Sequence, residues 1–237
     1  SPAFRWTETS PGILATERRG RVNESIAVLA GTPVDTWMGA EVLRKAGLTG
    51  IPFPVSEDPR AQTAFQILPE AEKQAAVAEI LRRGMEQGCR KALVYCNSMS
   101  AAVDFSSLSK QLRLPVVTPM DVYRRAAGAY RRLGVIAANA QGLAGIERTL
   151  LTANPQLDLY GACALPAVLS VEAGELPEEL VERHHLAALA DWFQSCGAEK
   201  LILGCTHFPY FKAALAARTR LPLLDPDEEM LSLLRGL

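Results

Sequence analysis

Two distant segments of the chain follow the same template, and this repeat constrains the fold more than any other feature of the sequence. Residues 88–96 and 197–205 each read Gly-x-x-Lys, then a short apolar run, then a cysteine. Small polar residues and a helical pattern follow each cysteine. A short, continuous apolar strand beside a helix is typical of a parallel sheet covered on both faces. The repeat therefore predicts two similar α/β units rather than one large sheet.

Short apolar runs alternate with helical patterns along most of the remaining chain, as expected for such units. Prolines at positions 52, 54 and 59 indicate a loop. Further strands are predicted at residues 26–29, 114–118, 134–138, 157–160 and 221–224. Helices are predicted at residues 35–46, 69–87, 121–133, 142–151, 177–194 and 227–234.

Bulk composition excludes several classes of function. The chain has 237 residues, 49% of them hydrophobic, which is enough for a substantial core. Its net charge of −1 favours neither a nucleic-acid nor a membrane-surface partner. No apolar run approaches the roughly 18 residues of a spanning helix, and the N-terminus lacks a signal-peptide pattern. The five cysteines are odd in number and widely spaced, which predicts reduced thiols and a cytoplasmic protein.

The two template cysteines are candidate functional residues because each follows a predicted strand. In α/β proteins, ligands bind outside the carboxyl ends of the strands, beside helix N-termini. The helix N-terminus favours a thiolate at Cys96 and at Cys205. The backbone N–H groups there, with the side chains of Asn97, Ser98 and Thr206, form a candidate carboxylate site. Two thiols on opposite walls of one cleft suit a reaction that needs a base on each face of one carbon, which is racemisation.

A packing role is the alternative for any cysteine that ends an apolar strand, because cysteine is among the most buried residue types. Cys89, Cys163 and Cys196 are interpreted in this way. His207 is placed to tune Cys205 or to hold its proton. Cys205 and His207 are too few ligands for a zinc site, so no metal is expected.

The motifs Cys96-Asn97-Ser98 and Gly-Cys-Thr-His-Phe-Pro at residues 204–209 resemble the cofactor-independent aspartate/glutamate racemase superfamily. The second motif is close to the glutamate racemase signature, and the resemblance covers residues 25–235. It implies two pseudo-symmetric, Rossmann-like α/β domains with parallel sheets and an active site in the cleft between them. Residues 25–118 plus 208–237 would then form the first domain and residues 119–207 the second, with residues 1–24 as an N-terminal extension.

The resemblance also implies roles for individual residues. Cys96 and Cys205 would be the two acid/bases, with His207 assisting Cys205. Asn97, Ser98 and Thr206 would hold the α-carboxylate and the amine of an amino-acid substrate. Neither a pyridoxal phosphate lysine motif nor a phosphate-binding loop is recognised, so no cofactor is expected. Glutamate or aspartate is the expected substrate, and a homodimer is left open.

The chain departs from the family pattern at two places. Glutamate racemases carry Asp-Ser-Gly after the first strand, where the Asp assists the first cysteine, but this chain has Ala-Gly-Thr-Pro at residues 30–33. Asp35 is the nearest candidate for the assisting acid. A threonine-containing turn of the family is replaced by Ala-Asn-Ala at residues 138–140, where Asn139 is a candidate hydrogen-bonding residue. The hydroxyls of Thr32 and Thr118 are expected to help recognise the substrate side chain.

Two alternatives to an amino-acid racemase follow from these departures. One is another reaction of the superfamily on a small carboxylate, as in hydantoin racemases or maleate isomerases. Arylmalonate decarboxylases use one cysteine, so the paired cysteines count against them. The other alternative is a non-catalytic relative that binds a ligand in the same cleft.

Overall fold

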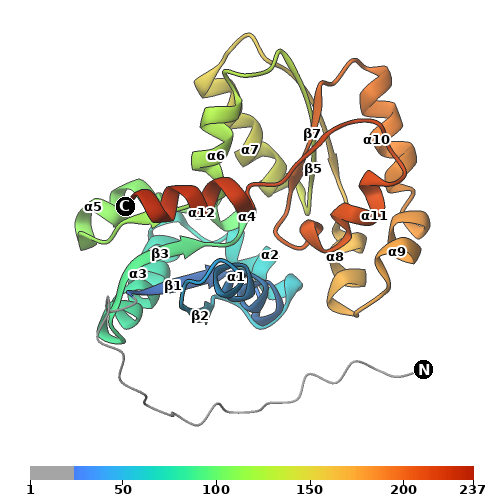
Figure 1. Ribbon diagram of the computed structural model, residues 1–237. Coiled ribbons are helices and arrows are strands. Elements are labelled where there is room, and N and C mark those ends of the chain that lie inside the picture. The colour runs from blue at the N-terminus through green and yellow to red at the C-terminus, as the bar shows by residue number, and fades with distance from the viewer. Residues whose placement is uncertain (1–23) are drawn as a thin grey trace.

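The computed structural model describes residues 24–237, so the expected N-terminal extension lies outside the described residues apart from Glu24. The described chain forms two α/β units (Figure 1), each built on a parallel four-stranded sheet. The strand orders, β2-β1-β3-β4 and β6-β5-β7-β8, are equivalent. The predicted fold class, two related α/β units with parallel sheets, is therefore confirmed. The strands are β1 Ser25–Ala30, β2 Gly50–Pro54, β3 Cys89–Val94, β4 Val116–Val117, β5 Arg132–Ala137, β6 Asp158–Cys163, β7 Lys200–Gly204 and β8 Leu223–Leu224.

The first unit surrounds the sheet that contains β1 and β3. Strand β1 and the second half of β3 are almost fully buried, which accounts for their continuous apolar sequences. Their side chains form one core with the apolar faces of the surrounding helices. The helices of this unit are α1 Pro33–Lys45, α2 Pro59–Gln66, α3 Glu70–Glu86, α4 Asn97–Ala102, α5 Phe105–Leu112 and α12 Asp227–Gly236.

The second unit repeats the arrangement around β5 and β7. Two apolar clusters fill the two faces of its sheet, one centred on Phe193 and Phe208 and the other on Tyr123 and Leu150. No helix within residues 24–237 is long and apolar enough to cross a membrane. The helices are α6 Pro119–Ala126, α7 Ala140–Ala153, α8 Leu165–Glu172, α9 Pro177–Arg183, α10 Leu186–Ser195, the 3₁₀ helix η1 Phe208–Phe211 and α11 Lys212–Ala216.

The structure divides the C-terminal part of the chain differently from the expected boundary at residue 208. Strand β8 pairs with β7, and Phe208, Phe211 and Leu221 lie in the core of the second unit. The backbone N–H and C=O groups of the short strand β8 need hydrogen-bonding partners, and the edge of β7 provides them. Only α12 returns to the first unit (Figure 1), where Met230 and Leu234 join the core.

Three local predictions also differ from the structure. The proline-rich segment contains β2, an edge strand, where Pro52 and Pro54 are tolerated because outward N–H groups need no partner. The helix predicted at residues 177–194 is two helices, since His185 adopts a left-handed conformation with φ of 52°. The helix predicted from residue 121 ends at Ala126, because the chain must turn before β5 begins at Arg132.

The two units meet where α4 of the first lies against α7 of the second. At the crossing, Gly145 faces Ala101 so closely that a Cβ on Gly145 would lie 1.9 Å from the Ala101 Cβ. Glycine is therefore required for this approach of the two helices. Because α4 follows Cys96 and α7 follows Asn139, the contact sets the spacing between the carboxyl ends of the two sheets.

Candidate active site

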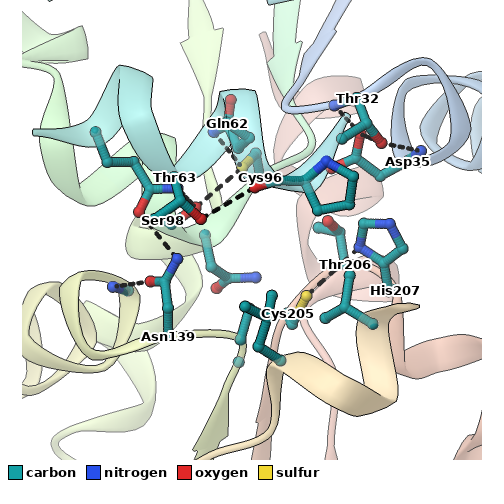
Figure 2. Close-up of a pocket in the computed structure, with 18 residues that line it drawn as sticks. Thr32, Asp35, Gln62, Thr63, Cys96, Ser98, Asn139, Cys205, Thr206 and His207 are labelled. Carbon is teal, nitrogen blue, oxygen red and sulfur yellow. Dashed lines mark hydrogen bonds between the residues drawn. The ribbon is translucent and has the colours of Figure 1, made fainter. Parts of the chain in front are cut away.

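A narrow cavity of about 40 Å³ lies at the carboxyl ends of both sheets (Figure 2). Its walls come from the residues that follow β1, β3, β5 and β7, and from α2 and α8. Cys96 and Cys205 lie on opposite sides of it. The lining residues are Thr32, Asp35, Pro59, Gln62, Thr63, Gln66, Cys96, Asn97, Ser98, Ala138, Asn139, Gly142, Leu165, Val168, Gly204, Cys205, Thr206 and His207.

All the sequence-predicted site residues except Thr118 line this cavity. Thr118 lies at the start of α6, where its backbone N–H and its hydroxyl donate to Asp121 Oδ2 at 2.8 and 3.0 Å. It lines a separate hollow with residues of α5. Threonine before a helix is a common capping residue. The structure thus gives Thr118 a capping role and does not bring it to the thiols.

Cys96 is 5% exposed and immediately precedes α4. Its sulfur lies 3.6 Å from Gln62 Nε2 and 3.5 Å from Ser98 Oγ. Burial, followed by the negative charge of Asp35, raises the pKa of the Cys96 thiol to about 12. Hydrogen bonds from Ser98 and from the Met99 backbone lower this pKa, but burial outweighs them. At Cys96, burial therefore outweighs the lowering of the pKa that was expected at the start of the helix.

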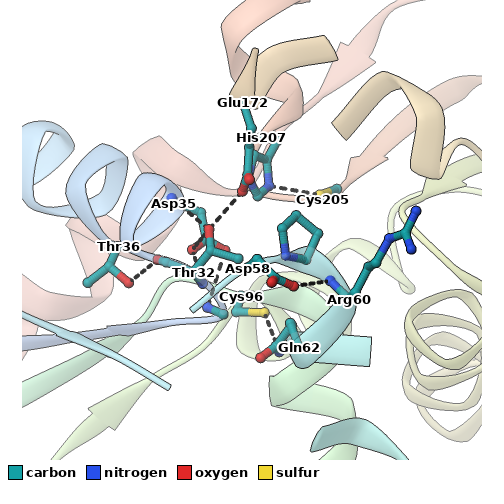
Figure 3. A network of polar contacts seen from close by, with 12 residues as sticks. Thr32, Asp35, Thr36, Asp58, Arg60, Gln62, Cys96, Glu172, Cys205 and His207 are labelled. Carbon is teal, nitrogen blue, oxygen red and sulfur yellow. Dashed lines mark hydrogen bonds and ion pairs between the residues drawn. The ribbon is translucent and has the colours of Figure 1, made fainter. Parts of the chain in front are cut away.

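Cys205 has a different set of neighbours (Figure 3). Its sulfur lies 3.6 Å from His207 Nδ1, and His207 Nε2 lies 2.9 Å from Glu172 Oε1. Burial lowers the pKa of His207, but the contacts with Cys205 and Glu172 and the charge of Asp35 together raise it well above its usual value. These contacts favour the protonated form of the imidazole beside the Cys205 sulfur.

Glu172 also joins the two units. The Thr32 hydroxyl donates to Glu172 Oε1 at 2.8 Å, so polar contacts run from Cys205 through His207 and Glu172 to Thr32. Glu172 lies at the end of α8, and nothing in its local sequence distinguishes it from a solvated helix residue. Sequence analysis missed it because its partners are distant along the chain.

Asp35 belongs to the turn between β1 and α1. Its carboxylate accepts hydrogen bonds from the backbone of Gly31 at 3.2 Å and of Thr32 at 2.6 Å, and it completes a capping box with the Thr32 side chain. Burial raises the pKa of Asp35, although the nearby His207 opposes this shift. The carboxylate lines the cavity, while its hydrogen bonds go to the start of α1. Its role as an assisting acid stays a prediction.

Asn97 lines the cavity and carries a side-chain donor that has no partner among the described residues. Its Oδ1 accepts a hydrogen bond of 2.5 Å from the hydroxyl of Tyr123. Its buried Nδ2 has no hydrogen-bond partner within residues 24–237. A buried amide donor without a partner costs free energy, so Asn97 Nδ2 is a candidate donor to a bound ligand. Tyr123 fixes this orientation, and sequence analysis missed it within an apolar helix face.

Helix α2 provides further polar residues that the sequence did not single out, among them Gln66. Gln66 Nε2 donates to Ser98 Oγ at 2.8 Å, and its Oε1 accepts from Asn139 Nδ2 at 3.2 Å. Gln66 thereby bridges residues of the two units. Asn139 Oδ1 also caps α7 by accepting from the Gly142 backbone at 3.0 Å. Thr206, 3% exposed, completes the wall beside Cys205.

The residues described by the structure contain no group of three or more His, Cys, Asp or Glu side chains arranged to hold a metal ion. The site is thus a small polar cavity with one thiol on each wall. An amide and a hydroxyl lie beside Cys96, and an imidazole lies beside Cys205. These are groups that can move protons and hold a carboxylate.

A family model described as Asp/Glu/Hydantoin racemase matches residues 21–233. The match covers nearly the whole chain, and the fold and paired thiols agree with it. The chain therefore belongs to the Asp/Glu/hydantoin racemase family, whose named members here are racemases, a class of isomerases.

Curated relatives include glutamate racemases. That of Beutenbergia cavernae is 32% identical over 163 residues, which are 66% of this chain and 55% of the relative. That of Thermus thermophilus is 33% identical over 138 residues, 56% of this chain and 49% of the relative. The chain thus spans about half the length of the curated relatives it matches.

Solved structures share the fold. Glutamate racemase from Francisella tularensis in complex with D-glutamate has a TM-score of 0.70 and 20% identity, covering 90% of this chain and 80% of that one. Allantoin racemase from Pseudomonas fluorescens has a TM-score of 0.61 and 19% identity, covering 90% and 92%. At these identities the similarity establishes the architecture.

Proposed function

We propose that this chain is a cofactor-independent amino-acid racemase that exchanges the Cα proton between Cys96 and Cys205. The observation that supports the proposal is the pair of buried thiols, which follow equivalent strands and line one cavity from opposite sides. Glutamate racemases among the relatives support glutamate or aspartate as substrate. The cytoplasmic location and the homodimer stay predictions.

In the proposed reaction, one cysteine is a thiolate and the other a thiol. The thiolate removes the Cα proton from one face, and the thiol returns a proton to the other face. The negative charge of Cys205 raises the pKa of Cys96, so the two sulfurs oppose simultaneous ionisation. Each turnover leaves the two protonation states exchanged, ready for the reverse reaction.

The carbanion needs stabilisation because a Cα proton is very weakly acidic. Negative charge develops on the substrate carboxylate, and preorganised donors aimed at that charge give the largest single stabilisation in many enzymes. The orphaned Nδ2 of Asn97 and the hydroxyls of Ser98 and Thr206 are the candidate donors. On the Cys205 side, His207 and Glu172 provide a proton reservoir next to the sulfur.

The cavity in this structure is too small for an amino acid, since about 40 Å³ accommodates only a few water molecules. Substrate binding therefore requires the residues that line the cavity to move apart. Closure after binding would exclude water and strengthen the electrostatic interactions within the site.

A second candidate substrate class is a neutral ring such as a hydantoin. The lining residues within 24–237 include no lysine or arginine to pair with a second carboxylate. The match to an allantoin racemase spans 92% of that chain. For glutamate, recognition of the side chain would fall to groups such as Thr32 and Asn139.

Incubation with single enantiomers in heavy water tests the proposal. A racemase incorporates deuterium at the stereocentre while it interconverts the enantiomers, whereas a ligand-binding relative incorporates none. Glutamate, aspartate and a 5-substituted hydantoin should be compared. Exchange with glutamate or aspartate supports the amino-acid assignment, exchange with the hydantoin alone corrects the substrate, and no exchange with any of them contradicts racemisation.

A further inference from the structure

Gln62 of α2 lies directly against one of the two reacting thiols. Its side chain is buried, with 6% of the residue exposed, and its Nε2 is 3.6 Å from Cys96 Sγ (Figures 2 and 3). Sequence analysis gave Gln62 no role. The proton transfer between the two thiols does not by itself involve Gln62.

Two neighbours hold the carboxamide in this orientation. The Ser56 hydroxyl donates to Gln62 Oε1 at 3.1 Å, which leaves the N–H end toward the sulfur. On the other side, a Cβ on Gly31 would lie 2.8 Å from Gln62 Cδ and Cγ, so only glycine leaves room for the side chain there. The turn after β1 and the loop before α2 therefore position the donor together.

A hydrogen-bond donor matters more for the thiolate of Cys96 than for that of Cys205. The charged groups that act on Cys96 are Asp35 and the Cys205 thiolate, and both disfavour a negative sulfur. The imidazole of His207 is hydrogen-bonded to Cys205 on the opposite wall. What stabilises negative charge at Cys96 is hydrogen bonding, from Ser98, from the Met99 backbone and from Gln62.

We propose that Gln62 is a catalytic residue that donates a hydrogen bond to the Cys96 sulfur and stabilises its thiolate during proton transfer. The proposal rests on the proposed function in assigning Cys96 as a base. An amide does not ionise in the physiological pH range, so Gln62 can donate a hydrogen bond to the sulfur without exchanging a proton with it. The two sulfurs thus have different neighbours, an imidazole beside Cys205 and an amide beside Cys96.

The test is alkylation of Cys96 by iodoacetamide at about pH 9, followed by mass spectrometry of each cysteine peptide. Below the pKa of a thiol, the alkylation rate follows the thiolate fraction. Gln62→Met keeps the length of the side chain but removes the donor. The alkylation rate of Cys96 should therefore fall by a factor of about 10 or more. Gln62→Glu places a carboxylate there and should slow Cys96 further, while Cys205 in the same molecules keeps its rate.

Gln74→Met, on α3 outside the cavity, is the matched control and should leave the Cys96 rate unchanged. Catalysis supplies the second readout. Deuterium exchange should fall for the enantiomer whose proton Cys96 removes, and KM should change less than kcat. Unchanged or faster Cys96 alkylation in both folded Gln62 variants would overturn the proposal. Absence of exchange in the unaltered protein would instead overturn the proposed function, so the two failures are distinguishable.

Discussion

At the scale of single residues, the site depends on side chains held in one orientation by partners from other elements. Asn97 is the clearest example, because Tyr123 occupies its oxygen and leaves its Nδ2 for a ligand. Burial raises the pKa of Tyr123 well above its usual value, so the hydroxyl keeps its proton and remains a donor. The amide orientation that the proposed carboxylate contact requires is therefore set by a residue outside the cavity lining.

Tyr123→Phe tests this arrangement. The variant keeps the buried ring but removes the hydroxyl, so Asn97 loses its fixed orientation. A neutral hydrogen bond contributes about 1 kcal/mol, and kcat/KM should fall about fivefold, mainly through KM. Tyr210→Phe removes an exposed hydroxyl that donates to a backbone carbonyl, and it should leave both constants unchanged. Equal kcat/KM in Tyr123→Phe and the unaltered protein would exclude the positioning role.

At the scale of helices and strands, the contact between α4 and α7 determines how the two thiol-bearing strand ends face each other. Gly145 permits this contact, since any Cβ there would overlap Ala101. Helices that approach so closely transmit a small shift directly to the residues at their N-termini. Those residues are Cys96 and Asn97 on one helix and Asn139 on the other.

Gly145→Ala should therefore impair catalysis and stability together. Overpacking typically costs about 1–3 kcal/mol, and a displacement of about 1 Å at a site can reduce rates about 100-fold. Thermal unfolding and kcat/KM are the measurements, with Gly128→Ala, which meets nothing closer than 4.0 Å, as the control. Ala101→Gly combined with Gly145→Ala should restore most of the activity. Wild-type kcat/KM in Gly145→Ala alone would show that this contact does not set the site geometry.

The elements also show how far the sequence predicts the structure. Strands such as β1 and β7 were predictable because they are buried on both faces and hence continuously apolar. Strand β2 was not, because its prolines mimic a loop and are tolerated only at a sheet edge. The cysteines and their polar neighbours were recognised from local motifs. Glu172 and Gln62 were not, because their roles come from contacts with residues far away in the sequence.

At the scale of the whole molecule, the connection from β8 to α12 carries the chain from the second unit back to the first. A cluster of polar side chains lies at this crossing. Asp225 pairs with Lys212, and Asp227 accepts a hydrogen bond of 3.0 Å from the hydroxyl of Tyr95, the residue before Cys96. Burial, followed by the charge of Asp225, raises the pKa of Asp227 to about 7.

This shift predicts a pH-dependent stability. The pKa of Asp227 is raised from its usual value of 3.8, so the folded state favours the protonated carboxyl. The protonated carboxyl of Asp227 contributes fully to the stability of the fold below about pH 4. This contribution is lost as the pH rises through about 7. Asp227→Asn removes this loss and should stabilise the protein by about 1–3 kcal/mol at pH 8, with little effect at pH 4. Denaturant unfolding at both pH values measures it, and an equal effect at both would contradict the assignment.

The central claim is that two thiols from two α/β units act on opposite faces of one carbon. Cα exchange and enantiomer interconversion in heavy water, measured for Cys96→Ala and Cys205→Ala, test it most directly. We expect each variant to fold and to lose interconversion by about 1000-fold or more, because a single base cannot return the proton to the opposite face. Each should still eliminate the leaving group from one enantiomer of a β-substituted substrate analogue, and the two variants should choose opposite enantiomers. Full interconversion by either single variant would contradict the two-thiol mechanism.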